Sequence, residues 1–327
     1  MSEQQHQRIL ITGATGFVGG WLAQELSAAY PGARLFGTTH GHAPAAPPPP
    51  AVTLLPCDLT VPAEVAAVVD AAEPDRVFHL AGFASAAGGD ADTIRRVNVG
   101  ATRTLLQTLA DAGRPCRALL ASSGYVYGAT RPGRPAREDD PVAPAGAYAE
   151  SKAEMERDVA AFRASGGDNL TLVITRSFNH TGPHQTTDFV VPAFARQLAR
   201  IEAGLEPPVV RVGNLDARRD FLDVRDVVRA YRLLLCEAAL ADPITTVNVC
   251  SGSDIAIRAL LDMLVAHASA EVSVEQDPNR MRPSDLPECV GDPARLTALT
   301  GWRPQIPIEQ TLADTLGWWR TQETGNA

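Results

Sequence analysis

Three glycines spaced three residues apart constrain this chain more than any other feature. They lie in RILITGATGFVGGWLAQELSAAY, residues 8–30, between a short apolar strand and an amphipathic helical pattern. Gly13 suits a tight turn, Gly16 lets backbone N–H groups approach a pyrophosphate, and Gly19 allows close helix packing. The alternative is a glycine-rich turn that only joins two packed elements. The order of strand, turn and helix predicts a dinucleotide site with the anion at the helix N-terminus.

Further apolar stretches alternate with helical patterns. They are ARLFGTTHG (33–41), VTLLPCDLT (52–60), PDRVFHLAGFASAA (74–87) and RALLASSGYVYG (117–128). This alternation predicts an α/β fold, a doubly wound parallel (Rossmann) sheet that binds ligands at the carboxyl ends of its strands. Asp58 and Leu59 would flank the adenine, and Ala81 and Gly82 would pass beneath the cofactor. The alternative for Asp58 is the N-cap of a helix that starts after Pro62.

The second strand ends at Thr38, Thr39 and His40, near the expected position of the adenosine ribose. An acidic residue there would favour NAD by pairing with the 2′-hydroxyl group. Because no carboxylate would repel a 2′-phosphate, we expect NADP (NADPH) as the cofactor, with NAD possible since no arginine is present either. The segment HAPAAPPPP, residues 42–50, is expected to be an extended surface loop.

Lys152 is the only lysine in the chain, although Lys and Arg together number 29. It lies four residues after Tyr148 in a helical pattern, so both side chains share one helix face. An ammonium group favours phenolate over phenol and would lower the pKa of the tyrosine. The alternative is an exposed helix lysine that happens to follow a tyrosine. The strand that ends at Ser122 and Ser123 would supply a hydroxyl group to hold the substrate oxygen.

Charge and composition restrict the class of partner. The net charge of −9 and pI near 5.3 argue against a general nucleic-acid or acidic-membrane binder and favour a small anionic ligand. The odd number of cysteines, five, indicates reduced thiols rather than a disulfide framework. The N-terminus has no apolar signal region and no apolar run reaches about 18 residues, so we expect a cytoplasmic protein.

An ordered set of motifs resembles the extended short-chain dehydrogenase/reductase family. The motifs are TGATGFVG, HLAG, NVGAT, SSGYVYG, YAESK and RSFNHTGP. The resemblance implies that Ser123, Tyr148 and Lys152 are catalytic. It also implies that Asn98 lies near the nicotinamide end of the cofactor. The full expected set of cofactor-binding residues is Gly13, Thr15, Gly16, Phe17, Val18, Gly19, Thr39, Asp58, Leu59, Leu80, Ala81, Gly82, Asn98, Tyr148 and Lys152.

The second half resembles a narrower group, the GDP-mannose 4,6-dehydratases and the GDP-4-keto-6-deoxy-mannose reductases. This resemblance implies that Asn179 touches the sugar or diphosphate, that Val190 lies near the base, and that two arginines hold phosphates, Arg219 and Arg282. Taken alone, each arginine would be read as a solvated surface charge. Ser123 and Tyr125 complete the expected substrate-binding set. His180 and His184 have no third ligand at metal spacing, so we interpret them as polar loop or pocket residues.

Three departures from the dehydratases favour the reductases. The dehydratases carry a glutamate at the position of Tyr125, a basic pair at the positions of Pro192 and Ala193, and an arginine-containing loop where this chain has the proline-rich one. A phenol cannot easily replace a carboxylate base in water elimination. Carbonyl reduction, in contrast, needs only Ser123 and the tyrosine–lysine pair.

The sequence therefore predicts an NAD(P)H-dependent 4-ketoreductase of a GDP-linked 4-keto-6-deoxyhexose that yields a GDP-rhamnose type product. The alternatives are a GDP-mannose 4,6-dehydratase, another nucleotide-sugar dehydratase or epimerase, and a non-catalytic NADP-sensing binding protein. We expect residues 1–176 with parts of 222–262 to form the dinucleotide domain, and 177–221 with 263–327 to form the substrate domain. A homodimer would pair the helices near 93–112 and 148–162, whose leucine and alanine faces suit packing.

Overall fold

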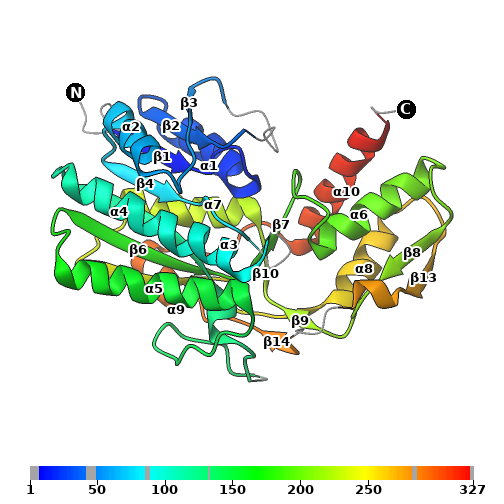
Figure 1. Ribbon diagram of the computed structural model, residues 1–327. Helices are drawn as coiled ribbons and strands as arrows, with labels where there is room; N and C mark the ends of the chain where they lie inside the picture. The colour runs from blue at the N-terminus through cyan, green and yellow to red at the C-terminus, as the bar shows by residue number, and fades with distance from the viewer. Residues whose placement is uncertain (1–6, 42–48, 85–88, 132, 282–285, 325–327) are drawn as a thin grey trace.

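A seven-stranded parallel sheet forms the centre of the larger part of the molecule (Figure 1). The computed structural model describes residues 7–41, 49–84, 89–131, 133–281 and 286–324. The strand order is β11-β6-β5-β4-β1-β2-β3, with β1 Arg8–Thr12, β2 Arg34–Thr39, β3 Val52–Pro56, β4 Arg76–His79, β5 Cys116–Ser123, β6 Leu170–Ser177 and β11 Ile244–Val249. The order reverses on the two sides of β1, which creates a ligand crevice at the carboxyl ends of the strands.

Helices cover both faces of this sheet, as expected for a doubly wound fold. One face packs against α1 Phe17–Ala29, α7 Val224–Arg232, η5 Leu233–Glu237 and α9 Ala294–Thr300. The other face packs against α2 Pro62–Ala72, η3 Arg96–Ala101, α4 Thr102–Asp111 and α5 Ala147–Ser165, with the short α3 Ala91–Arg95 beside α5. Strand alternation produces the two cores: Ile9 and Ile11 point to the first face, and Leu10 points to the second. The predicted fold class is confirmed.

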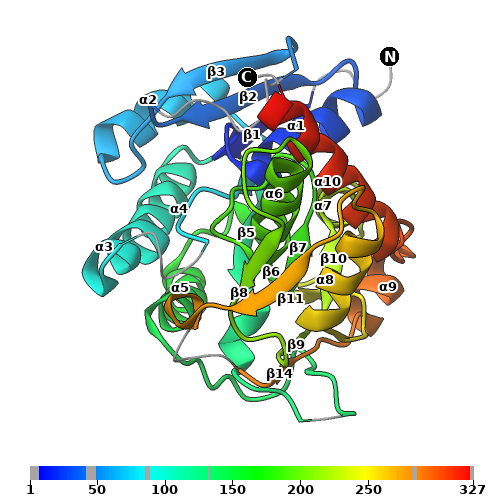
Figure 2. The same cartoon turned by 90° about the vertical axis from the view of Figure 1, so that its right-hand side faces the viewer.

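A smaller lobe lies beside the sheet and has its own apolar core (Figures 1 and 2). It contains α6 Val190–Glu202, α8 Ile257–Ala266, α10 Ile308–Thr324 and the parallel pair β8 Val209–Val212 and β13 Ser273–Gln276. Short pairings connect the lobe to the sheet: β7 Asn179–Thr181 with β10 Phe221–Asp223, and β9 Arg218–Arg219 between β12 Ile255–Ala256 and β14 Glu288–Cys289. The chain also forms two short 3₁₀ helices, η4 Gly124–Tyr127 and η6 Pro278–Arg280.

The division into a dinucleotide domain and a substrate domain stays a prediction. The packing shows that one part of the segment assigned to the substrate domain contacts the large sheet. Helix α9 and Trp302 fall within 263–327 in the sequence, yet they pack on the sheet with α1 and α7. The Trp302 indole donates to the backbone carbonyl of Asp226 at 3.0 Å. The chain therefore crosses back to the sheet before α10 returns to the small lobe.

The leucines of α4 do not form an outer face for a partner. Leu105, Leu106 and Leu109 are buried in the core between α4 and the sheet. The outer surfaces of α3, α4 and α5 instead carry ion pairs within the chain, Arg95–Glu154 and Arg103–Asp158. The leucines of α4 are therefore not available to a partner copy, because the core of the sheet already uses those side chains, and the expected homodimer stays a prediction.

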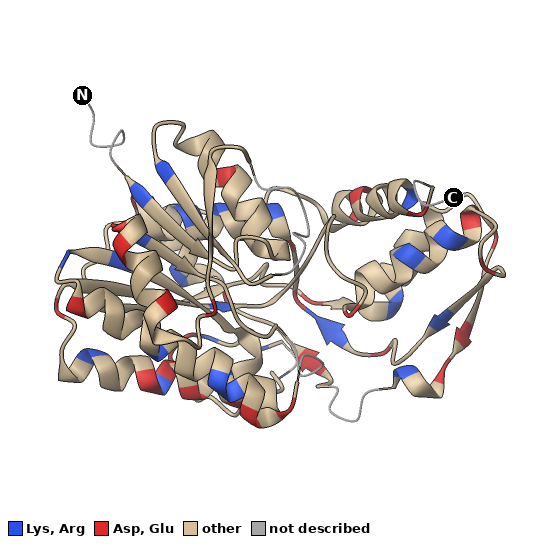
Figure 3. Cartoon of the chain, turned by 45° about the horizontal axis from the view of Figure 1, so that its top comes forward, with Lys and Arg blue, Asp and Glu red and all other residues tan. Residues whose placement is uncertain are grey.

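Acidic and basic residues are interspersed on helices of both lobes (Figure 3). All five cysteines are free, and four of them are buried. Within the described part of the chain, no helix combines the length and apolar character needed to cross a bilayer. Residues 42–48 of the proline-rich loop lie outside the described residues.

Candidate active site

The glycine-rich turn fits a dinucleotide pyrophosphate. Gly13 has a φ of +71°, and the turn closes through a 3.0 Å hydrogen bond from the Gly16 N–H to the Gly13 carbonyl. A Cβ atom on Gly19 would overlap that same carbonyl oxygen. Helix α1 starts directly after Gly16, so its first N–H groups face outward from the turn, where an anion is favoured. Thr15, Phe17 and Val18 belong to this turn and the start of α1, as expected from the sequence.

The expected adenosine end of the crevice lies where β2 and β3 finish. The Asp58 carboxylate accepts hydrogen bonds from the backbone N–H and the hydroxyl of Thr60, at 2.8 and 2.7 Å, and these bonds lower its pKa. Helix α2 has Val61 as its N-cap and no side-chain cap, so the N-cap alternative for Asp58 is wrong. Leu59 is buried beside it, and Thr39 is the half-buried last residue of β2.

Two basic side chains, His40 and Arg96, lie near Asp58. His40 and Arg96 both lower the Asp58 pKa by their charge. Arg96, an exposed residue at the start of η3, was not recognised from the sequence, because it lies 38 residues further along the chain in a helical segment. Only the fold shows that η3 comes close to the end of β3.

Ser123 and not Ser122 faces the predicted tyrosine. Consecutive residues of β5 point to opposite faces of the sheet. The Ser122 hydroxyl donates to Glu156 at 2.5 Å, whereas Ser123 is buried and forms a hydrogen bond with Tyr148 that lowers the phenol pKa. The Ser123 oxygen also accepts from the Tyr125 N–H at 3.2 Å, which fixes its position at the start of η4.

Lys152 is buried on the same helix face as Tyr148, but its ammonium group points elsewhere. The Nζ atom donates to the carbonyl of Ala121 at 2.7 Å, and burial lowers the Lys152 pKa to about 8. Burial raises the Tyr148 pKa to about 12; the groups that modify it further are Ser123, Tyr125 and Tyr231. The expectation that Lys152 lowers the tyrosine pKa toward neutrality is wrong in this structure, because the β5 carbonyl binds the ammonium. Tyr148 is therefore a phenol at neutral pH.

Asn98 connects the loop after β4 to helix α5. Its Oδ1 accepts from the Phe83 N–H at 2.9 Å, and its Nδ2 donates to Ser151 Oγ, also at 2.9 Å. The Ser151 hydroxyl in turn donates to the Tyr148 carbonyl at 2.7 Å. A Cβ atom on Gly82 would lie 2.6 Å from Asn98 Oδ1. Only glycine allows the loop to lie this close to the Asn98 side chain.

A buried chain of hydrogen bonds behind Ala81 was not recognised in the sequence. The Thr102 hydroxyl donates to the Asn98 carbonyl at 2.8 Å, so it accepts from His79 Nε2 at 2.9 Å. The neutral ring then accepts at Nδ1 from the Thr12 hydroxyl, 2.8 Å away, and Thr12 accepts from the Ala81 N–H. The donor and the acceptor are therefore defined for every hydrogen bond from Ala81 to Asn98. Burial lowers the His79 pKa to about 3, which keeps the ring neutral.

The predicted substrate residues Tyr125, Asn179 and Arg219 meet beside Ser123. The Tyr125 hydroxyl accepts from Arg219 Nε at 3.3 Å and lies 3.5 Å from Asn179 Nδ2. Arg219 is only 4% exposed, and its Nη1 donates to the Arg218 carbonyl. The parallel pairing of β10 with β7 brings these segments together, with Phe221 opposite Asn179.

The remaining predicted substrate residues are not part of this cluster. Val190 is the first residue of α6 and packs partly buried against the core of the small lobe. Arg282 lies outside the described residues. Leu80 lies at the carboxyl end of β4, where its N–H donates to the Thr12 carbonyl at 3.3 Å.

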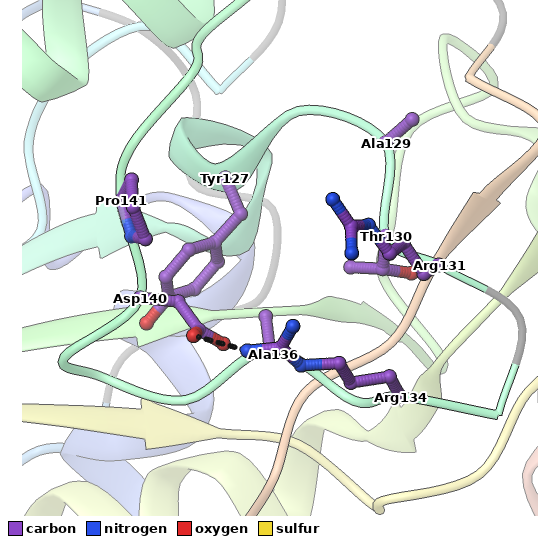
Figure 4. A pocket seen from close by; sticks show the side chains of 8 residues that line it. All are labelled: Tyr127, Ala129, Thr130, Arg131, Arg134, Ala136, Asp140 and Pro141. Atoms are coloured by element: carbon purple, nitrogen blue, oxygen red, sulfur yellow. Dashed lines mark hydrogen bonds and ion pairs between the residues drawn. The ribbon is translucent and has the colours of Figure 1, made fainter.

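A separate cavity lies under the loop between η4 and α5 (Figure 4). Arg131, Arg134 and Asp140 line it, and Arg134 donates to Asp140 at 3.1 Å. Tyr127 forms its inner wall, but the hydroxyl of this tyrosine already donates to Asn248 and accepts from Arg176. None of the predicted catalytic residues lines this cavity, so it is separate from the candidate active site.

Comparisons with known proteins agree with the geometry. The sequence profile of the GDP-mannose 4,6 dehydratase family matches residues 10–315. GDP-6-deoxy-D-mannose reductase of Pseudomonas aeruginosa is 35% identical over 97% of this chain and 98% of the relative. The structure of RMD from Pseudomonas aeruginosa complexed with NADPH has a TM-score of 0.81 and 34% identity, and the match covers 97% of this chain and 99% of that one. The UDP-glucose 4-epimerase of Thermus thermophilus in complex with NAD has a TM-score of 0.83 and 28% identity, with 96% and 99% covered.

Proposed function

This chain belongs to the GDP-mannose 4,6 dehydratase family of extended short-chain dehydrogenases/reductases and is an NAD(P)-dependent nucleotide-sugar enzyme; on this premise we propose that it is an NADPH-dependent 4-ketoreductase. Its substrate is a GDP-linked 4-keto-6-deoxyhexose, and its product is of the GDP-rhamnose type. The similarity to GDP-6-deoxy-D-mannose reductase supports this choice within the family.

The observation that carries the proposal is the set of groups around the Tyr148 phenol. The described side chains that shift its pKa are Ser123, Tyr125 and Tyr231, and none of these is a carboxylate. Dehydration of the sugar needs a base to remove the C5 proton, and Tyr125 occupies the position where a glutamate would serve. Its hydroxyl accepts from a buried arginine and therefore acts as a polar anchor instead of a base. Besides the hydride that the cofactor would supply, reduction requires only a proton donor and a hydrogen-bond donor from the protein.

The residues of the chain divide the reduction between them. When bound, NADPH supplies the hydride that adds to the C4 carbonyl carbon. Tyr148, a phenol at neutral pH, gives its proton to the C4 oxygen, and the raised pKa keeps this proton available. Ser123 donates a hydrogen bond to the same oxygen. Lys152 holds α5 against the end of β5, and its ammonium group would donate a hydrogen bond to the nicotinamide ribose.

NADPH is the proposed cofactor, with NADH accepted less well. Thr39 offers no carboxylate to repel a 2′-phosphate, and the positive charge of Arg96 near Asp58 favours an additional anion at this end of the crevice. The similarity to a structure complexed with NADPH supports the same assignment.

The diphosphate of the sugar nucleotide would bind where the small lobe joins the sheet. Arg219 is already buried there next to Tyr125 and Asn179, so it can form charge-assisted hydrogen bonds to a phosphate that lies beside these residues. By the same resemblance, Val190 would lie near the base and Arg282 would hold a phosphate. The guanine base itself is assigned from the similarity to the GDP-sugar relatives.

We also propose that two copies of the chain form a dimer through α3, α4 and α5. The charged residues on the outside of these helices, and not their leucines, would form the contact. Light scattering at micromolar concentration tests this assembly, and a monomer would contradict it.

Two incubations of the purified protein test the proposed reaction. GDP-4-keto-6-deoxy-mannose with NADPH should give a reduced 6-deoxyhexose and an equal amount of NADP⁺. GDP-mannose without added reductant should remain unchanged, and the appearance of a 4-keto-6-deoxy product would identify a dehydratase. Tight NADPH binding without turnover of any keto-sugar would identify a non-catalytic NADP-sensing protein.

A further inference from the structure

Helix α5 carries a third polar residue on the face of Tyr148 and Lys152. Glu156 lies four residues after Lys152, so the two side chains are neighbours on the helix. The Glu156 carboxylate accepts from the Ser122 hydroxyl at 2.5 Å. Ser122 directly follows Ala121, whose carbonyl accepts from the Lys152 ammonium. Adjacent residues of β5 therefore hold Lys152 and Glu156.

The carboxylate of Glu156 is largely enclosed and fixed in position. Arg176 on β6 donates to both of its oxygens, and the shortest of these contacts is 2.7 Å. The side chains of Glu156 and Arg176 are only 10% and 9% exposed. Arg176 also donates to the Tyr127 hydroxyl and to the backbone carbonyl of Glu138, whose own carboxylate pairs with Arg295. The negative charge of Glu156 is therefore held at one place behind the active site.

The ammonium group of Lys152 has a neutral partner. It belongs to a buried side chain and donates to the backbone carbonyl of Ala121. Burial lowers the Lys152 pKa to about 8, and the negative charge of Glu156 opposes this decrease. Loss of the proton would remove the charge that strengthens the hydrogen bonds of this side chain. The charge on Lys152 thus depends on an acid that it does not need to touch.

The other ionisable side chains around this pair cannot replace Glu156. His79 on β4 lies within the field of Lys152, but its own ring is neutral. Tyr148 on α5 is a phenol at neutral pH. Arg176 on β6 is positive and would disfavour a second cation. Among the residues that the structure describes here, Glu156 is the group that favours the ammonium form of Lys152.

We propose that Glu156 is a positioning residue of the active site, whose negative charge, fixed by Ser122 and Arg176, keeps Lys152 an ammonium group in its enclosed position. In this role Glu156 acts through Lys152. The importance for catalysis rests on the proposed contact of Lys152 with the nicotinamide ribose. It does not depend on the identity of the sugar or on whether the sugar is reduced or dehydrated.

The single lysine of the chain allows a direct test. Protein that contains carbon-13-labelled lysine gives one lysine side-chain signal in NMR, and its chemical shift against pH reports the Lys152 pKa without cofactor or sugar. The wild-type pKa should be about 8, below the ordinary value of 10.5. Glu156→Gln removes the charge but keeps a side chain of similar size, so it should lower the Lys152 pKa by about half a pH unit or more.

Two further variants separate the charge of Glu156 from the stability of its ion pair. Arg176→Met breaks the same pair but leaves the carboxylate, so the Lys152 pKa should stay at the wild-type value or rise. Glu154→Gln breaks an exposed ion pair of the same helix, with Arg95, and should leave the Lys152 pKa unchanged. An unchanged Lys152 pKa in Glu156→Gln, or an equal decrease in Arg176→Met, would overturn the proposal.

Folding of the variants is checked by circular dichroism. If Glu156→Gln does not fold, the double variant of Glu156→Gln with Arg176→Met takes its place. The double variant leaves no unpaired enclosed charge at this pair and should also lower the Lys152 pKa, and an unchanged value would overturn the proposal.

Binding of NADPH, followed by its fluorescence between about pH 7 and pH 10, connects Glu156 to the cofactor site. Wild-type affinity should decrease as the pH rises through the Lys152 pKa, and in Glu156→Gln this decrease should begin at a lower pH. A changed NMR titration with unchanged binding would support the action of Glu156 on Lys152, and it would contradict the proposed contact of Lys152 with the ribose.

Discussion

The ammonium nitrogen of Lys152 donates a hydrogen bond to the backbone carbonyl of Ala121 at 2.7 Å. Ala121 lies on β5 two residues before Ser123, and Lys152 lies on α5 one helical turn after Tyr148. This bond therefore ties the helix of the tyrosine to the strand of the serine. A Cβ atom on Gly82 would lie 3.7 Å from the same nitrogen, so the space around it is limited. A compact ammonium fits here, and a planar guanidinium does not.

Lys152→Arg should lower kcat by roughly 10²-fold or more. The charge is kept, but the larger head cannot occupy the buried position, so Tyr148 and the cofactor ribose lose their alignment. Steady-state reduction kinetics measure the effect, with circular dichroism as the check on folding. Arg157→Lys, an exchange at an exposed position of the same helix, is the matched control and should be neutral. Near-wild-type kcat in Lys152→Arg would show that charge alone is needed.

Tyr125→Phe should raise KM for the sugar nucleotide roughly tenfold or more, with a smaller change in kcat. The substitution removes the oxygen that accepts from Arg219, and loss of a hydrogen bond to a charged group costs about 1.5–3 kcal/mol. The buried guanidinium would then shift away from the position that suits a diphosphate. Tyr30→Phe, far from the crevice, serves as the control, since its hydroxyl contacts Glu237. An unchanged KM would show that Tyr125 does not contribute to binding of the sugar nucleotide.

Thr39→Asp should change the cofactor preference toward NADH. A carboxylate at the end of β2 would repel a 2′-phosphate and could accept from a 2′-hydroxyl. Comparison of kcat/KM for NADPH and NADH before and after the substitution checks this. Arg96→Ala should weaken NADPH binding more than NADH binding, because only NADPH carries the additional charge. A wild-type enzyme that strongly prefers NADH would contradict the assignment.

His79 should make the protein less stable as the pH falls below 6.5. Its pKa is lowered from 6.5 to about 3 in the folded state, so the unfolded chain takes up a proton first. The stabilisation is complete above pH 6.5 and decreases by about 1.4 kcal/mol for each pH unit below it. Urea unfolding at pH 7.5, 6 and 5 measures the slope. The His79→Gln variant should be less stable at pH 7.5, but its free energy of unfolding should depend less steeply on pH. If the variant and the wild type show the same dependence, His79 is not the cause of the pH effect.

Local patterns in the sequence were sufficient for the sheet and for the choice of the main catalytic candidates. The glycine spacing predicted the turn between β1 and α1, and the spacing of four residues predicted that Tyr148 and Lys152 share a helix face. The choice between Ser122 and Ser123 needed the structure or the resemblance, because only the alternation along β5 shows which hydroxyl points to Glu156 and which to Tyr148.

Contacts between distant segments could not be read from local patterns. Arg96 comes close to Asp58 only because η3 packs near the end of β3. The chain of His79, Thr12 and Thr102 joins three elements by polar side chains that have no periodic signal. The direction of the Lys152 ammonium depends on one backbone carbonyl, Ala121, so the spacing that placed the lysine did not predict its partner.

Transfer of a deuterium label from the cofactor to the sugar tests the central claim most directly. The enzyme would be incubated with GDP-4-keto-6-deoxy-mannose and NADPH that carries deuterium at the transferable C4 position of the nicotinamide, and the sugar would be analysed by NMR and mass spectrometry. A ketoreductase predicts one deuterium at sugar C4, with one NADP⁺ formed for each sugar reduced. A product without deuterium at C4, or conversion of GDP-mannose to a 4-keto-6-deoxy sugar with no net consumption of NADPH, would contradict the account.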